Sequence, residues 1–317
     1  MGCFFKFLAS LLPLCSLCLA TSCGPQTAKQ LQPSPDSRRD MTQKAFTLTD
    51  LNCAAYLGRF KASASDVHGK VSRAAKLTMT EDSRHCIVES NGIPNHPFND
   101  GPVPFIHPVV PTPLTLSIVK LPTTDFTTTP LTQGADHGVF LNGVPFDLLP
   151  ATCFGARNAE GCKTSDTPWR YDPVKAKYIL SADRHHAHSS EKGAYRYHGS
   201  PKGLFDESGA RASGVIGFAA DGFPIMGPYI EENGSIRKVE SGFTLKVGPR
   251  KHLAGEAAFP GGYYDGTFRD DWHHTDAGDL DECNGRTLPD GRYVYHITSS
   301  FPWILSCFVG IPHPSFF

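Results

Sequence analysis

The chain has 317 residues, and its 30 lysine and arginine residues nearly balance 31 aspartate and glutamate residues, so the formal net charge is −1 at pH 7. The basic residues are dispersed, which excludes the basic patch of a nucleic-acid-binding protein and a polybasic membrane segment. The length suffices for one large domain, and neither a repeat nor a second linker divides it. We therefore expect a single domain without a nucleic acid partner.

The N-terminal residues are typical of an export signal. Residues 7–20 form an apolar run that is too short for a permanent membrane-spanning helix, and small residues follow where a signal peptidase cuts. Residues 19–23 resemble a bacterial lipobox, with Cys23 as the lipid-attachment residue. We predict a signal peptide over residues 1–22 and an exported protein of the bacterial periplasm or cell envelope, which contacts the membrane only through a lipid anchor. Ordinary signal cleavage, with Cys23 left as a thiol, is the alternative.

A polar segment follows the signal. Residues 24–44 hold glutamine, proline, serine and mixed charges with few apolar side chains. Such a segment buries too little apolar surface to compensate for the entropy lost on ordering. We predict a disordered tether over residues 23–44 and a folded domain over residues 45–317.

Segments rich in β-branched and aromatic residues, bounded by Gly, Pro, Asn or Asp, predict strands along the folded part. Helical periodicity is weak, and short helices are expected only near residues 51–57 and 174–178. Asn142-Gly143 and Asp221-Gly222 have the composition of hairpin turns. The predicted fold class is mainly β: a single β-rich domain with many turns, few short helices and disulfides. The expected strands cover residues 76–80, 86–89, 114–120, 138–141, 215–219, 235–239, 243–247 and 292–298.

Six cysteines follow Cys23, and an even number in an exported chain favours disulfides. None of them has the spacing of a metal-binding clip. Cysteines committed to disulfides leave His, Asp, Glu and Tyr as metal ligands, so a Cu(I) site of thiolates and thioethers is disfavoured. Sequence proximity favours three pairs, which are Cys53 with Cys86, Cys153 with Cys162, and Cys283 with Cys307.

Residues 185–198 contain the densest group of imidazoles and phenols in the chain. His186 and His188 are two positions apart, so they project from one face of an extended chain. Arg196 and His198 have the same spacing. If the residues between the two pairs close a hairpin, pairing 188 with 196 and 186 with 198 gathers three imidazoles and a guanidinium on one patch.

Three neutral imidazoles suffice to ligate a transition metal, and Cu(II) and zinc both accept imidazole. We therefore predict a site for one such ion at this patch, with His186, His188 and His198 as ligands. Tyr195 and Tyr197 are expected behind them. The alternative is a set of surface histidines on a polar hairpin.

Several segments of the chain resemble the YHYH family of exported bacterial proteins, which is named for a Tyr-His-Tyr-His motif. They span about residues 76–317. The resemblance implies metal binding as a role and no settled reaction. The segments that carry it are residues 90–96, 141–146, 195–199, 219–225, 264–268, 280–286, 301–302 and 307–310.

The motif in this chain is Tyr-Arg-Tyr-His over residues 195–198, so Arg196 stands where the family motif has its first histidine. A guanidinium stays protonated and cannot ligate a metal. His185 and His186 could supply the missing nitrogen, or Arg196 could turn the patch toward a carboxylate or phosphate. His96, in a proline-bounded loop of a matched segment, is a further candidate ligand.

No catalytic residue is predicted, because the chain has no Gly-x-Ser-x-Gly elbow, His-Glu-x-x-His helix or Walker loop. A metal-free envelope module, in which Arg196 and the two tyrosines bind a small anion or sugar, is an alternative to the metal site. A metallohydrolase is the third interpretation, and it needs a general base such as Asp221 or Glu191. Asp221 could instead orient a ligand histidine.

Overall fold

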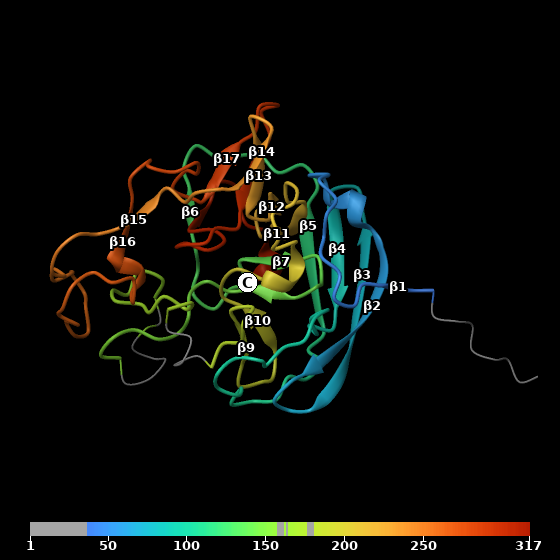
Figure 1. The fold of residues 1–317 in the computed structure, drawn as a ribbon, viewed down its shortest axis with the longest axis horizontal. Helices are drawn as coiled ribbons and strands as arrows, with labels where there is room; N and C mark the ends of the chain where they lie inside the picture. Colours follow the sequence, from blue (N-terminus) through green and yellow to red (C-terminus); the bar gives the residue numbers. More distant parts are fainter. Residues whose placement is uncertain (1–36, 157–161, 163, 176–180) are drawn as a thin grey trace, which may run out of the picture. The chain divides into compact units, whose positions relative to one another are not determined.

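A sheet of five strands forms the first part of the fold. The structure, a computed structural model, describes residues 37–156, 162, 164–175 and 181–317. Strands β2 to β5 pair antiparallel in chain order, and β1 pairs in parallel with β2. Figure 1 shows these strands side by side in blue to green. Their bounds are β1 (Arg39–Asp40), β2 (Gly58–Asp66), β3 (Val71–Glu81), β4 (His85–Ser90) and β5 (Leu114–Val119).

A second sheet of eight strands carries the histidine-rich segment. Its order is β17-β18-β12-β11-β7-β8-β10-β9, so the hairpin of β9 and β10 lies at one edge. Strand β10 joins the sheet through a parallel pairing of Tyr197 with Phe146 of β8. The bounds are β7 (Gly138–Phe140), β8 (Pro145–Phe146), β9 (Ala187–Ser189), β10 (Tyr195–Tyr197), β11 (Val215–Ala219), β12 (Pro224–Met226), β17 (Gly285–Thr287) and β18 (Tyr293–His296).

The remaining elements are short. Three two-stranded pairs are formed by β13 (Tyr229–Glu232) with β14 (Ser235–Lys238), β15 (Phe243–Leu245) with β16 (Trp272–His274), and β19 (Cys307–Phe308) with β6 (Thr129–Pro130). The helices among the described residues are 3-10 helices, namely η1 (Cys53–Tyr56), η3 (Lys202–Leu204), η4 (Arg269–Asp271) and η5 (Pro314–Phe316). None of these described helices has the length and apolar character that crossing a membrane requires.

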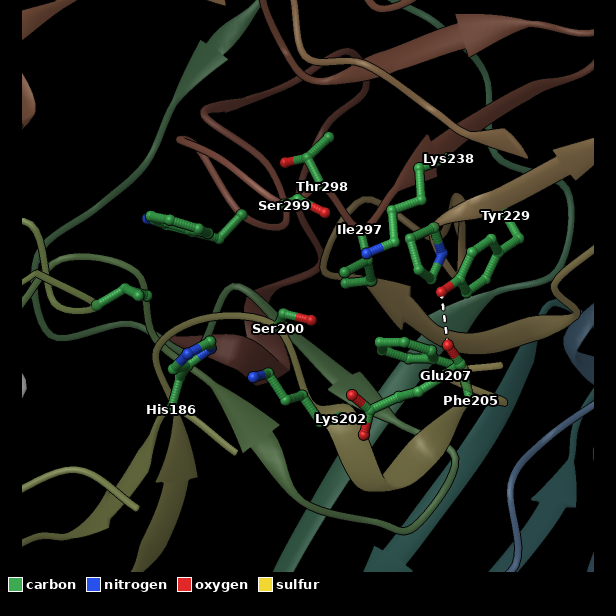
Figure 2. Close-up of a pocket in the computed structure, with 13 residues that line it drawn as sticks. His186, Ser200, Lys202, Phe205, Glu207, Tyr229, Lys238, Ile297, Thr298 and Ser299 are labelled. Atoms are coloured by element: carbon green, nitrogen blue, oxygen red, sulfur yellow. Dashed lines mark hydrogen bonds between the residues drawn. The ribbon is translucent and has the colours of Figure 1, made fainter. Parts of the chain in front are cut away.

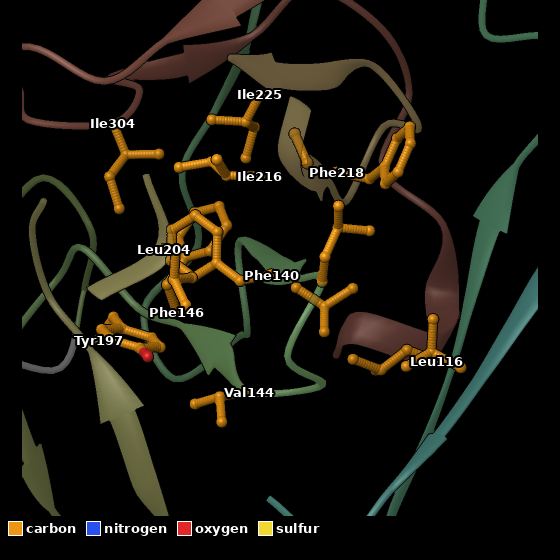
Figure 3. Packing of buried hydrophobic residues seen from close by; sticks show 14 of the residues in the cluster. Leu116, Phe140, Val144, Phe146, Tyr197, Leu204, Ile216, Phe218, Ile225 and Ile304 are labelled. Atoms are coloured by element: carbon orange, nitrogen blue, oxygen red, sulfur yellow. The ribbon is translucent and has the colours of Figure 1, made fainter. Parts of the chain in front are cut away.

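One hydrophobic core joins the two large sheets. Its buried cluster contains Leu116 of the first sheet together with Phe140, Ile216 and Tyr197 of the second, and Figure 3 shows these side chains packed together. Each large apolar side chain that is removed from water contributes about 1.5–3 kcal/mol. Because Tyr197 belongs to this core, packing fixes the β9–β10 hairpin rigidly to the domain.

The structure confirms the mainly β fold class. Each of the eight strand segments predicted from the sequence overlaps a strand of the structure. The two predicted turns join β7 to β8 and β11 to β12, with Gly143 and Gly222 at φ of +80° and +89°. The three predicted disulfides, Cys53–Cys86, Cys153–Cys162 and Cys283–Cys307, are also formed.

The N-terminal segments are placed only in part. The predicted signal peptide and Cys23 lie outside the described residues. Residues 37–44, the last part of the segment for which the sequence predicts a tether, contribute β1 and the buried Met41 to the first sheet. Backbone pairing with β2 orders this part of the segment although its composition is polar.

Candidate functional site

The β9–β10 hairpin has the register that the sequence analysis assumes. Arg196 pairs with His188, and the flanking pairs join Tyr195 to Ser189 and Tyr197 to Ala187. Because side chains alternate between the faces of a strand, Arg196 and His188 share one face and the two tyrosines lie on the other. The hairpin therefore separates a polar face from an aromatic face.

His186 does not join the polar face. Its backbone lies in the left-handed region, with φ of +54°, immediately before β9. This conformation breaks the two-residue alternation, and the His186 ring lies instead 6.1 Å from the ring of Trp303, measured between centroids. The assumption that His186 and His188 project from one face is therefore wrong.

On the polar face, His188 and His198 lie ring against ring. Their centroids are 4.6 Å apart and their planes differ by 20°. The lone pair of an imidazole nitrogen lies in the plane of the ring. Two stacked rings have nearly parallel planes, so their lone pairs do not point at a common metal position. Among the residues that the structure describes, no group of three His, Cys, Asp or Glu side chains is arranged to hold a metal ion. The structure thus does not assemble the predicted three-histidine centre.

Three buried nitrogens of the polar face lack a hydrogen-bond partner in the described part of the chain. They are Nδ1 of His188, Nε of Arg196 and Nε2 of His198. His198 donates from Nδ1 to the backbone oxygen of Asp147, which leaves its Nε2 as a bare acceptor. Buried polar atoms are normally paired, so this face differs from an ordinary protein interior.

The charge of the polar face comes from Arg196. Burial and the charge of Arg196 lower the pKa of His188 to about 4, and burial chiefly holds the pKa of His198 well below its usual value. Both imidazoles are therefore neutral at pH 7. Nη1 of Arg196 lies 3.8 Å from Oδ2 of Asp147. Burial raises the pKa of Asp136 and of Asp147 to about 6, and in both cases Arg196 acts against this rise.

The aromatic face is buried and fully engaged. Tyr195 donates from its hydroxyl to Oδ2 of Asp183 at 2.8 Å. The hydroxyl of Tyr197 lies 2.6 Å from Nε2 of His96 and accepts from Nδ2 of Asn142 at 2.9 Å. Tyr195 and Tyr197 are only 1% and 0% exposed. These tyrosines brace the hairpin from within and are not surfaces for a ligand.

His96 belongs to this buried face. Its Nδ1 lies 2.8 Å from the carbonyl oxygen of Pro97 and donates to it, so its Nε2 accepts from the Tyr197 hydroxyl. The ring packs against His185 with centroids 3.8 Å apart, and burial lowers the pKa of His96 to about 4. Nδ1 of His185 in turn accepts from the backbone N–H of Gly203 at 3.0 Å. Both nitrogens of His96 are thus occupied, and neither histidine supplies a ligand to the polar face.

The two candidate general bases lie outside the paired strands β9 and β10. Asp221 accepts from the Tyr295 hydroxyl at 2.7 Å and from the backbone N–H of Gly310 at 3.1 Å, beside β18 and β19. Burial raises the pKa of Asp221 to about 6. Glu191 is exposed in the turn of the β9–β10 hairpin. These positions give a structural role to Asp221 and none in orienting a histidine of the hairpin.

A cavity of about 310 Å³ lies beside the hairpin, and His186 forms part of its wall. Figure 2 shows Lys202 and Lys238 approaching from opposite sides, with the hydroxyl of Ser200 between them. Glu207 is the carboxylate residue among the lining side chains. The lining consists of Val174, His186, Ser200, Lys202, Phe205, Glu207, Pro228, Tyr229, Lys238, Ile297, Thr298, Ser299 and Trp303.

The cations of the cavity are not neutralised by ion pairs. Neither Lys202 nor Lys238 forms an ion pair with a carboxylate in the described part of the chain. The ammonium of Lys238 lies 5.6 Å from the ring centroid of Tyr229, a cation–π distance. The cavity therefore combines two exposed ammonium groups with aromatic walls.

Two bulky residues of the cavity have left-handed backbones. Trp303, at φ of +71°, faces His186 at +54°. The Trp303 indole donates from Nε1 to Oδ2 of Asp172 at 2.9 Å, and this carboxylate also accepts from the backbone of Val174. Such a conformation costs about 1–3 kcal/mol for a residue other than glycine, and strained residues cluster at functional sites.

Of the residues that line the cavity, the sequence analysis singled out only His186 as a site residue. Lys202, Tyr229 and Lys238 come from η3, β13 and β14, and no motif connects them. Segments that carry the family resemblance lie near some of the lining residues, since residues 195–199 precede Lys202 and residues 301–302 precede Trp303, but they do not indicate that these residues share a cavity.

These features define a β-rich, disulfide-linked protein with an arginine-and-histidine hairpin beside a cationic cavity. The family model described as "YHYH protein" matches residues 115–310. The chain belongs to this YHYH protein family, which confirms the resemblance found in the sequence. No curated protein and no solved structure matches the chain.

Proposed function

We propose that this YHYH-family protein is a binding module for a small organic anion held in the cavity of His186, Lys202 and Lys238. The observation that carries the proposal is the pair of ammonium groups that converge on one cavity without carboxylate partners in the described chain. Carboxylates and phosphates are the groups that lysines recognise as point charges. Catalysis is not part of the proposal.

The walls of the cavity also offer aromatic and hydroxyl groups to a ligand. Phe205, Tyr229 and Trp303 supply aromatic surface, and the hydroxyls of Ser200 and Ser299 supply hydrogen bonds. Small-molecule sites are mostly apolar with a few placed polar groups, and a volume near 310 Å³ is at the small end of their range of roughly 300–1,000 Å³. A ligand of the size of one sugar ring, carrying a carboxylate or phosphate, fits this description.

The strained backbones support the same site. His186 and Trp303 are neighbours in the wall of the cavity, and both have left-handed backbone conformations that cost free energy. A hydrogen bond from the Trp303 indole to the buried Asp172 fixes the indole in place. Rigid side chains lose little entropy when a ligand binds, which favours affinity.

Titration calorimetry of the exported protein tests this function. Uronic acids, sugar phosphates and the matching neutral sugars are compared as ligands. We expect an acidic ligand to bind and its neutral analogue not to bind, and we expect Lys202→Met and Lys238→Met each to weaken binding about tenfold or more, as loss of a charged hydrogen bond of about 1.5–3 kcal/mol implies. Lys251→Met, which removes an exposed lysine that does not line the cavity, is the matched control. Equal effects of all three changes would contradict the proposal.

The proposed location is the exported cell envelope, with Cys23 as a lipid anchor. Six cysteines in three disulfides support an oxidising compartment. The lipobox-like residues 19–23 support lipid attachment. Membrane fractionation checks the anchor, because a Cys23→Ser variant should move from the membrane to the soluble fraction. Retention of that variant in the membrane would contradict lipid anchoring.

Binding of Cu(II) or zinc by the wild-type chain stays a prediction of the sequence. His186 lines the cavity, His96 has both nitrogens occupied, and His188 and His198 are stacked. The geometry therefore favours the small anion, which was the alternative, over the metal. Arg196 and the two tyrosines of the hairpin, which that alternative named as the contacts, are not the residues that line the cavity.

A further inference from the structure

Position 196 completes a set of three side chains on the polar face of the hairpin. It lies directly across from His188 and two residues before His198. A cross-strand pair combined with a residue two positions along the same strand places three side chains on one face. Three histidines are a sufficient protein ligand set for a tetrahedral zinc ion.

The orientation of His198 is that of a metal ligand. Its Nδ1–H donates to the backbone carbonyl of Asp147, and its Nε2 is buried without a partner in the described chain. Metal-ligating histidines almost always donate their second nitrogen to a carbonyl or carboxylate, which fixes the tautomer. Nδ1 of the half-buried His188 is also unpartnered there. Two potential donor nitrogens therefore exist on this face.

The third position is occupied by a permanent cation. The guanidinium of Arg196 lies beside the buried carboxylate of Asp147, with Nη1 3.8 Å from Oδ2, and its charge acts on both imidazoles. Asp136 also interacts electrostatically with Arg196. One positive charge thus acts on a buried carboxylate and on two imidazoles.

We propose that the Arg196 guanidinium takes the place of the metal ion of a three-histidine site, so that the hairpin carries its own cation and Arg196→His converts it into a zinc site. Rotation about the side-chain bonds of His188 and His198, whose rings are stacked, would direct their nitrogens toward a third imidazole at position 196. The inference concerns the hairpin alone and does not depend on the anion proposed for the cavity.

Cobalt(II), a spectroscopic substitute for zinc, tests the proposal on the full exported protein. We expect the Arg196→His variant to bind about one equivalent with the visible absorption of tetrahedral coordination, and to bind zinc in competition with it. The wild type should show no such absorption. Adding His198→Ala to Arg196→His should abolish the signal, whereas adding His313→Ala, which removes a histidine near the C-terminus, should preserve it.

Two results would overturn the proposal. One is a folded Arg196→His protein, with native circular dichroism and three intact disulfides, that binds neither metal. The other is a wild-type protein that binds cobalt or zinc through His198, because then the guanidinium does not replace the ion.

A second variant keeps the test valid if Arg196→His does not fold. Arg196→Gln removes the charge and adds no imidazole. We expect its melting temperature to lie below that of the wild type, because the buried carboxylate of Asp147 loses the neighbouring cation, and not to respond to zinc, because two imidazoles without a third do not suffice. A variant as stable as the wild type would contradict the role of Arg196 as an internal cation.

Discussion

Successive residues of the β9–β10 hairpin alternate between its two faces, and these faces differ in whether their buried polar atoms have hydrogen-bond partners. On the aromatic face, Tyr195, Tyr197 and His96 have their polar side-chain atoms in short hydrogen bonds. On the polar face, nitrogens of His188 and His198 are buried without partners in the described chain. The comparison separates histidines that hold the fold together from histidines that are available for chemistry, which residue type alone cannot do.

The largest expected effect comes from removing one hydroxyl of the aromatic face. Tyr197→Phe leaves His96 and Asn142 buried without their shared partner. Since each buried polar group left unpaired costs about 1–3 kcal/mol, we expect the free energy of unfolding to fall by about 2–4 kcal/mol. Urea unfolding of the oxidised protein, followed by tryptophan fluorescence, measures this change.

The matched change on the polar face is His188→Ala. Its Nδ1 has no partner to lose in the described chain, and its ring is half-buried, so we expect a loss of about 1 kcal/mol or less. If both variants lose the same stability, the distinction between the two faces fails.

A second effect is a dependence of stability on pH at the aromatic face. Burial raises the pKa of Asp183 to about 7, and the hydrogen bond from Tyr195 opposes this rise. The unfolded chain has the ordinary aspartate pKa of about 3.9, so between these values the folded state binds a proton that the unfolded state does not. The resulting stabilisation is complete below about pH 4 and is lost as the pH rises through about 7.

Asp183→Asn removes this titration. We expect the free energy of unfolding of the variant to fall less than that of the wild type between pH 5 and pH 8, as measured by urea unfolding at each pH. Asp82→Asn is the control, because Asp82 is exposed and hydrogen bonds from Arg84 and His85 lower its pKa to about 2. Parallel pH profiles of wild type and Asp183→Asn would show that Asp183 is not protonated in the folded protein.

Much of the fold could be predicted because its signals are local. Strand composition located eight strands, Asn142-Gly143 and Asp221-Gly222 marked two turns, and proximity in sequence paired all six cysteines. Strand β2 was missed, since its sequence GRFKASASD alternates small or charged residues instead of large apolar ones. Pairing with β3 on one side and with β1 on the other makes this segment a strand.

The candidate site could be predicted only in part. The sequence analysis assumed the hairpin register, and the structure has that register. The sequence does not predict that His186 leaves the face that carries His188. Its left-handed backbone depends on packing beside Trp303, which is more than a hundred residues away in the chain. The convergence of Lys202 and Lys238 likewise has no signal in any single segment.

The sequence by itself indicated the family, the β-rich class and the disulfide pairs, since each depends on composition or on spacing along the chain. The tertiary structure alone decided which histidines are buried and engaged, and which lysines share a cavity. The burial of a histidine and the approach of two lysines to one cavity depend on contacts between segments that are distant in the chain. A local sequence pattern does not predict the free energy of such contacts.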